Sequence, residues 1–240
     1  PVLFEDVDKP VARLMIEKAL KEGKNYLQEY EAVDLLWEYR LPVLPGSLAT
    51  SPEEAASKAS EIGFPVVMKI QSKDIVHKVD VKGVLLNVRT PEEAAKAYDL
   101  IVKNVKERVP DADIQGVYVT RQLPKGEEVI LGVKRDPSFG PVVMFGLGGT
   151  YVEIFGDVSF RVAPLSRRDA MNMIKQVKAY KILAGARGHR PRDVNSIVNA
   201  IIRLGQMAYE NPEITELDIN PLIVLREGQG CFVADAKIMF

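Results

Sequence analysis

The sequence is poor in cysteine and histidine and has no long apolar run. It has 240 residues, of which one is a cysteine, Cys231, and two are histidines. A single cysteine excludes an internal disulfide, and no apolar run reaches the roughly 20 residues of a bilayer-spanning helix. The first ten residues lack the basic segment and apolar core of a signal peptide. These absences predict a soluble protein of the reducing cytoplasm.

The sequence also lacks an excess of charge of either sign. Thirty-two basic residues against 33 acidic ones give a formal net charge of -1. No overall field therefore attracts nucleic acid or an anionic membrane. We expect neither as a partner, and any phosphate binding must depend on local charge.

The first half of the chain is rich in helix start signals. Apolar residues recur at helical spacing over residues 11–22 and 27–39. Two later stretches, from Ser51 and from Thr90, begin with a hydroxyl residue, a proline, two glutamates and two alanines, which is typical of a capped helix start. Apolar runs between these two helices are expected to be strands, at 65–70 and 83–88.

The second half is richer in strands. Residues 127–149 contain two β-rich runs joined by the turn sequence DPSFG, which indicates a hairpin. Ser166 and Asp169 have the spacing of a capping box. A further helix is expected at 193–209, and the chain ends in two more strands. We predict an α+β fold made of an N-terminal helical extension, a small lobe and a large lobe at residues 1–26, 27–114 and 115–240.

The last two strands bring oxygen-bearing side chains together. If Leu225 faces Cys231, Asn220 lies opposite residue 236 and within one position of Asp235, where Cβ atoms are roughly 5 Å apart. Alternation places Asp218 on the same face as Asn220. A few hard oxygen ligands suit Mg²⁺, which keeps water or phosphate oxygens in its shell. The residues alone also permit a second interpretation, a polar sheet face at a strand end.

Two other features could bind an anion. Lys69 ends a buried-looking strand, and its ammonium must reach water or meet a negative partner such as phosphate. The glycines of GLGGT, at 146–150, could bring backbone N–H groups close to an anion. They match neither the P-loop nor the dinucleotide pattern, and they equally suit a tight turn.

His77 lies in a lysine-rich stretch just after this strand. Lys73, Lys78 and Lys82 are its neighbours in the sequence. Positive neighbours favour the neutral, nucleophilic imidazole and attract phosphate, so phosphoryl capture is chemically open to this residue. The other histidine, His189, has no such context and is expected to be a surface residue.

Four separated segments carry a family resemblance. They read GFPVVMKIQSKDIVHKVDVKGV, GPVVMFGLGGTYVEIFGDVSFRVAPL, ELDINPLIV and ADAKI. In this order and spacing they resemble the β subunits of ADP-forming acetyl-CoA synthetases, in the NDP-forming acyl-CoA synthetase family. The resemblance covers nearly the whole chain. It implies an ATP-grasp fold, in which two α+β lobes hold a nucleotide between them.

The resemblance implies a role for each matching nucleotide-binding residue. Lys69 would contact the phosphates, and residues 76–78 would take the place of a glycine-rich phosphate loop in succinyl-CoA synthetases. Thr120 and Leu123 would line the adenine site, and Glu128 would reach the ribose. The implied set is Lys69, Val76, His77, Lys78, Thr120, Leu123 and Glu128.

The same resemblance implies the metal and catalytic residues. Asn220 and Asp235 would be Mg²⁺ ligands, and Asp218 would be an acid near a phosphohistidine. His77 would itself be phosphorylated and would relay the group from a phosphohistidine of an α subunit to ADP. About ten residues of extended loop can span roughly 30 Å, so a loop can carry such a group.

The resemblance also implies a partner. The family needs a CoA-binding domain and a ligase domain with the first phosphohistidine, and we find neither in these residues. We expect an α subunit in an α2β2 hetero-oligomer, with this chain performing the nucleotide half of acyl-CoA + ADP + phosphate ⇌ carboxylic acid + ATP + CoA. Two alternatives stay open, a carboxylate-amine ligase of the ATP-grasp type and a degenerate ATP-grasp module that senses nucleotide or acyl-CoA.

Overall fold

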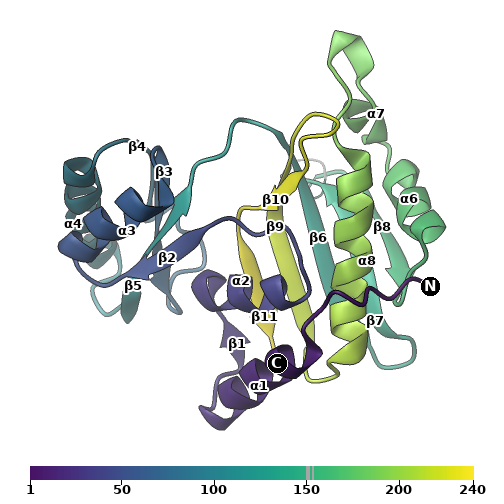
Figure 1. Ribbon diagram of the computed structural model, residues 1–240, viewed down its shortest axis with the longest axis horizontal. Helices are drawn as coiled ribbons and strands as arrows, with labels where there is room; N and C mark the ends of the chain where they lie inside the picture. Colours follow the sequence, from purple (N-terminus) through teal and green to yellow (C-terminus); the bar gives the residue numbers. More distant parts are fainter. Residues whose placement is uncertain (150–151, 153) are drawn as a thin grey trace. The chain divides into compact units, whose positions relative to one another are not determined.

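The chain forms two compact units. The computed structural model describes residues 1–149, 152 and 154–240. The large unit combines residues 1–43 with 125–240, and the small unit consists of residues 44–124. In each unit a layer of helices packs on an antiparallel sheet (Figure 1). The predicted α+β class is therefore confirmed.

These units differ from the predicted lobe boundaries. The sequence suggested a separate helical extension followed by a small lobe from residue 27, whereas residues 1–43 pack with the C-terminal half. The cause is apolar packing, because Ile16 and Leu36 of the first two helices lie in the same buried core as Leu217 of a late strand. Helical periodicity shows which face of a helix is buried but not which sheet will cover it.

The small unit is a four-stranded sheet with two helices on one face. Its elements are β2 (Gly46–Ala49), α3 (Pro52–Ile62), β3 (Val66–Ser72), β4 (Val84–Val88), α4 (Pro91–Arg108) and β5 (Ile114–Arg121). The strand order is β2-β5-β3-β4. The expected helix starts are confirmed, since the side chains of Ser51 and Thr90 accept the backbone N–H groups of Glu54 and Glu93.

As far as its residues are described, the large unit is a seven-stranded sheet that helices cover on one face. Its strands are β1 (Tyr26–Leu27), β6 (Glu127–Asp136), β7 (Gly140–Leu147), β8 (Val158–Val162), β9 (Glu216–Val224), β10 (Cys231–Val233) and β11 (Ala236–Met239). The order is β1-β11-β9-β6-β7-β8, and β10 extends the sheet by pairing with β9.

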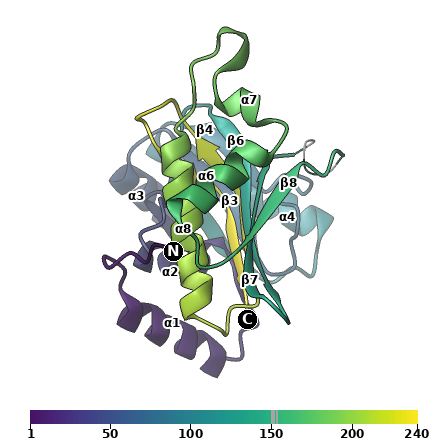
Figure 2. The ribbon, with the colours of Figure 1, turned by 90° about the vertical axis from the view of Figure 1, so that its right-hand side faces the viewer.

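Five α-helices of the large unit are described, and a 3-10 turn follows the fourth. They are α1 (Lys9–Lys21), α2 (Glu29–Glu38), α6 (Arg167–Gln176), α7 (Tyr180–Leu183), the turn η1 (Ala186–Gly188) and α8 (Val194–Glu210). Figure 2 shows α8 and α6 packed together over the sheet. The capping box of Ser166 and Asp169 is confirmed. Among the described residues, no helix is long and apolar enough to cross a membrane.

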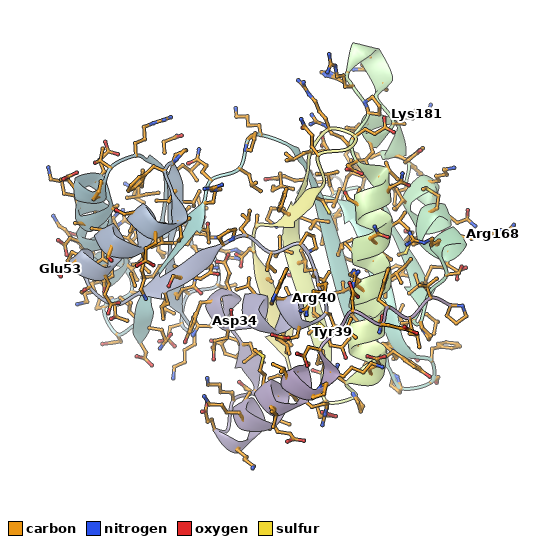
Figure 3. All side chains as sticks on the ribbon, in the orientation of Figure 1. Asp34, Tyr39, Arg40, Glu53, Arg168 and Lys181 are labelled. Carbon is orange, nitrogen blue, oxygen red and sulfur yellow. The ribbon has the colours of Figure 1, made fainter. Side chains whose placement is uncertain are left out.

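The N-terminal helices are fastened to the large unit by polar contacts as well. Tyr39, labelled in Figure 3 at the end of α2, is buried and donates its hydroxyl to Glu210 Oε2 at 2.8 Å. Asn211 Nδ2 donates to the same hydroxyl oxygen at 2.9 Å. Both partners lie at the C-terminal end of α8, so α2 and α8 are tied together.

The face of each sheet that is turned away from its helices is called here the distal face. In the small unit it is turned away from α3 and α4, and in the large unit from α8. Strand alternation assigns the side chains, because Leu217 and Ile219 lie in the core with α8 whereas Asp218 between them does not.

The C-terminal hairpin corrects the predicted register by one residue. Leu225 N–H donates to Gly230 O at 3.0 Å, and Cys231 pairs with Val224. Gly228 and Gly230 both have positive φ, which closes a tighter turn than the five residues expected. Asn220 therefore lies opposite Asp235 itself instead of residue 236, and its N–H donates to Asp235 O at 3.1 Å.

The face assignment can be tested on β9 with one residue type. Ile219→Ala removes a fully buried side chain and should lower the free energy of unfolding by about 2–5 kcal/mol. Ile223→Ala should cost clearly less, because the register shift between Ile219 and Leu222 in the β9–β6 pairing places this half-buried residue on the distal face. Urea unfolding followed by circular dichroism measures both. Equal losses would contradict the assignment of the two faces.

Candidate functional site

The small unit places Lys69 on its distal face. Met68 and Ile70, on either side of it in β3, are buried in the core under the helices. Lys69 is half-buried and is paired directly with Tyr118 of β5 and Val84 of β4. Its side chain therefore leaves the sheet on the side away from α3 and α4.

Thr120 shares this distal face. It lies in β5 opposite Val67 and Gly46, two residues beyond Tyr118, and its side chain is buried. Leu123 follows the end of β5 and is half-buried. The small unit thus carries the ammonium group of Lys69 on β3 and, at the end of β5, the hydroxyl of Thr120 and the apolar side chain of Leu123. These are separate parts of the predicted nucleotide site.

His77 lies at the exposed tip of the loop between β3 and β4. Val76 and Val79 around it are 83% and 75% exposed, although both are apolar. The loop folds back on itself, since Gly83 N–H donates to Lys78 O and Ile70 N–H donates to Gly83 O. A Cβ on Gly83 would come within 2.5 Å of Ile70 Cγ2, so the return needs glycine.

The roots of this loop are anchored. Asp113 N–H donates to Asp74 Oδ2 at 2.7 Å, and Asn104 Nδ2 donates to Lys82 O at 3.1 Å. Ile75 and Val81 pack partly buried against the small unit's core. The imidazole of His77 is therefore presented on a short exposed segment between two fixed ends.

The distal face of the large unit gathers the other predicted residues. Cross-strand pairing builds one row from Lys237, Asp218, Gly132, Met144 and Phe160. The neighbouring row contains Asp235 and Asn220, and Glu128 lies farther along β6, exposed and on the same face. The β11–β9 side of this face is polar, whereas the β7–β8 side is apolar.

Asp218 is the most perturbed acid on this face. Burial raises the pKa of its carboxyl group to about 6, and the charges of Asp235 and Glu216 act in the same direction, while Lys237 opposes them. Asp218 also lines a cavity of about 430 Å³ whose floor includes Gly132 and Met144. A cation or proton donor next to Asp218 would offset the free-energy cost of keeping this carboxylate charged.

The oxygen donors fit Mg²⁺ by their chemistry. Asp235 uses Oδ1 to accept the N–H of Ala236 at 2.8 Å, and its backbone pairing with Asn220 holds the two residues side by side. A carboxylate and an amide oxygen are hard ligands. Within the described residues, no group of three His, Cys, Asp or Glu side chains could form a full protein cage. The pair therefore suits an ion that takes further ligands from phosphate.

Three other sequence features remain, the GLGGT motif, His189 and the glycine of VILGVK. Gly148 of GLGGT donates its N–H to Glu128 O at 2.8 Å, whereas Thr150 of that motif lies outside the described residues. His189 is exposed, in agreement with its interpretation as a surface residue. The cavity beside Asp218 was missed, although a glycine inside the strand pattern VILGVK was a signal for it.

Comparisons with known proteins show which family the chain belongs to. A family model described as an ATP-grasp domain matches residues 18–240. The chain is 48% identical over 228 residues to the β subunit of the ADP-forming acetate–CoA ligase I of Pyrococcus furiosus, covering 95% of this chain and 97% of that one. The chain belongs to this family of β subunits.

Two further members of the family show how this β-subunit module is used elsewhere. In the ADP-forming acetate–CoA ligase I of Archaeoglobus fulgidus, a 44% identical region covers 92% of this chain but 32% of that protein. A structure of the acetyl-coenzyme A synthetase 1 of Ca. Korarchaeum cryptofilum matches with a TM-score of 0.84 and 47% identity, over 95% of this chain and 99% of that one. It contains coenzyme A and Mg-AMPPCP, and its phosphohistidine segment points towards the nucleotide binding site.

The metal assignment predicts a specific loss of affinity. Asp235→Ala removes the charged ligand and should weaken binding of Mg²⁺-nucleotide about tenfold or more, measured by calorimetry. Affinity for the nucleotide in EDTA should change little. Asp99→Ala, which removes an exposed acid of α4, is the control. Unchanged affinity and unchanged Mg²⁺ dependence in Asp235→Ala would remove Asp235 from the metal site.

Proposed function

We propose that this chain is the nucleotide-binding β subunit of an ADP-forming acyl-CoA synthetase. The overall reaction is acyl-CoA + ADP + phosphate ⇌ carboxylic acid + ATP + CoA, and this chain performs its nucleotide half. The observation that carries the proposal is His77 itself. It is an exposed histidine on an anchored loop that follows the strand of Lys69, in a family with a phosphohistidine segment in a solved member.

In the proposed relay, His77 accepts and then donates one phosphoryl group. A neutral ring nitrogen of His77 forms a P–N bond as the P–N bond to the partner's phosphohistidine breaks. A β-phosphate oxygen of ADP then attacks phosphorus, forming the P–O bond of ATP as the P–N bond to His77 breaks. Each step transfers one phosphoryl group and leaves a neutral imidazole after proton exchange.

Residues of both units contribute to nucleotide binding in this proposal. Lys69 neutralises phosphate charge. The backbone and side chains of Val76 and Lys78 flank the phosphates. Thr120 and Leu123 contact adenine, and Glu128 accepts hydrogen bonds from the ribose hydroxyls. Their support is the motif resemblance to the family together with the distal-face positions of Lys69, Thr120 and Glu128.

Asn220 and Asp235 hold Mg²⁺ in this proposal, and the ion supplies positive charge against the nucleotide phosphates. Asp218 orients the imidazole of the phosphohistidine by accepting its N–H, which fixes the ring tautomer for transfer. The cavity beside Asp218 gives an imidazole room to approach, because Gly132 leaves the floor without a side chain.

The partner in this proposal is an α subunit with the CoA-binding and acyl-phosphate-forming regions, and we propose an α2β2 assembly. Fused relatives support such a division, since this module makes up about a third of the Archaeoglobus protein. A carboxylate-amine ligase would form an acyl phosphate without any phosphohistidine, which leaves His77 without a role. A degenerate sensor is disfavoured because Lys69, His77, Asn220 and Asp235 are all present. The cytoplasmic location predicted from the sequence stays a prediction.

The relay predicts a labelled histidine. Incubation of the chain with γ-labelled ATP and Mg²⁺ should give one label that is acid-labile and alkali-stable, as a phosphoramidate is. His77→Ala should abolish the label and lower ATP synthesis in the complex by orders of magnitude, while nucleotide affinity stays within a few-fold. Asp218→Ala should give an amount of label and a rate of ATP synthesis between those of the unchanged chain and those of His77→Ala.

His189→Ala is the matched control, since it removes the other histidine. It should label as the unchanged chain does. A label that persists in His77→Ala, or that disappears in His189→Ala, would show that His77 is only a loop residue near phosphate.

The division between subunits makes a separate prediction. The purified chain should bind nucleotide but should not synthesise ATP from acyl-CoA, ADP and phosphate, and addition of the α subunit should restore the reaction. A coupled assay of ATP formation measures this. Robust acyl-CoA-dependent synthesis by the chain alone would refute the division.

A further inference from the structure

The edge of the small unit contains an irregularity with no evident role in packing. Between β3 and β4, Val66 pairs with Val88 and Met68 pairs with Leu85, so two residues of β4 face the single residue Val67. One of the two, Asn87, has a φ of 58°. Left-handed backbone is uncommon for residues other than glycine, and asparagine tolerates it best.

The side chain of Gln122 satisfies this bulge. The backbone N–H of Asn87 donates to Gln122 Oε1 at 2.6 Å, and Gln122 Nε2 donates back to Asn87 Oδ1 at 2.8 Å. The backbone N–H of Gln122 donates to Pro65 O at 3.1 Å. Three hydrogen bonds therefore fasten the residue that directly follows β5, although Gln122 belongs to no strand itself.

The hydrogen bonds of Gln122 fix the chain between the two proposed adenine contacts. Thr120 precedes Gln122 by two residues and Leu123 follows it, and both are the proposed adenine contacts. We propose that the reciprocal amide pair of Asn87 and Gln122 is a positioning device that holds residues 120–123 in place to bind the base of the nucleotide. This inference rests on the proposed function.

The surroundings favour a positioning role over a stabilising one. Asn87 is exposed and Gln122 is only half-buried, so water competes for their hydrogen bonds and the net gain in stability is small. The left-handed backbone of Asn87 also costs energy. The strained backbone of Asn87 therefore adds little to stability. Because it lies next to a proposed ligand contact, its role is to fix the geometry of residues 120–123.

The test separates the base from the phosphates. Gln122→Met keeps the length of the side chain but has neither the acceptor for Asn87 N–H nor the donor to Asn87 Oδ1, so both bonds of the pair are lost. Calorimetry should show Mg²⁺-ADP binding weakened about tenfold, with Mg²⁺-tripolyphosphate binding unchanged, because only the base contacts move. In the complex, KM for ADP should rise while kcat stays the same.

Two substitutions of Asn87 isolate the hydrogen bond from the backbone. Asn87→Asp keeps an oxygen that accepts from Gln122 Nε2, and it should retain ADP affinity. Asn87→Gly adopts the positive φ easily but has no acceptor, and it should weaken ADP binding several-fold. Thr50→Val removes another exposed side-chain hydrogen bond of the small unit, to Glu54, and is the control that should change nothing.

The outcomes are distinguishable. Gln122→Met with unchanged ADP affinity, while Leu123→Ala weakens it, would overturn the positioning role alone. Unchanged affinity in both variants would show that the base does not bind at residues 120–123, which contradicts the proposed function as well. Equal weakening of ADP and tripolyphosphate binding would mean general loosening of the unit and would also overturn the inference.

Discussion

A β-strand directs alternate side chains to opposite faces, and this constraint decides where chemistry can occur in both units. In each sheet, helices bury one face with apolar side chains, and the polar residues interleaved with them must then lie on the distal face. Lys69 between Met68 and Ile70, and Asp218 between Leu217 and Ile219, are placed by this alternation alone. The buried core and the proposed phosphate-binding residues are thus placed by the same strands.

The distal face of the large unit concentrates negative charge. Glu216 and Asp218 lie two residues apart on β9, Asp235 directly precedes β11, and Lys237 of β11 offsets their charge only in part. Isolated carboxylates so close together repel, and burial adds to the cost. The Mg²⁺ ion and the imidazole N–H of the proposed site would offset this cost.

Local features of this fold could be predicted, and non-local ones could not. The capped starts at Ser51, Thr90 and Ser166 depend on residues three apart, and all three are as predicted. The register of the last hairpin was wrong by one because two glycines close its turn more tightly than its length suggests. The assignment of residues 27–43 to the large unit depends on which sheet covers α2, and strand or helix patterns carry no such information.

The site residues follow the same division. Asn220 and Asp235 were expected together because a hairpin joins them, and they lie opposite each other. The contact of Gln122 with Asn87 joins residues 35 apart through a bulge, and no spacing rule predicts it. The cavity beside Asp218 requires four strands in register, although Gly132 hinted at it.

Transfer from the protein to nucleotide tests the central claim most directly. The chain labelled by ATP is freed of nucleotide, mixed with Mg²⁺-ADP in the absence of any partner, and quenched over a range of times. The account predicts that the label moves from His77 to ATP in one turnover, one molecule of ATP for each phosphorylated chain. Label that stays on the protein, or that leaves only as inorganic phosphate, would contradict a phosphoryl relay through His77.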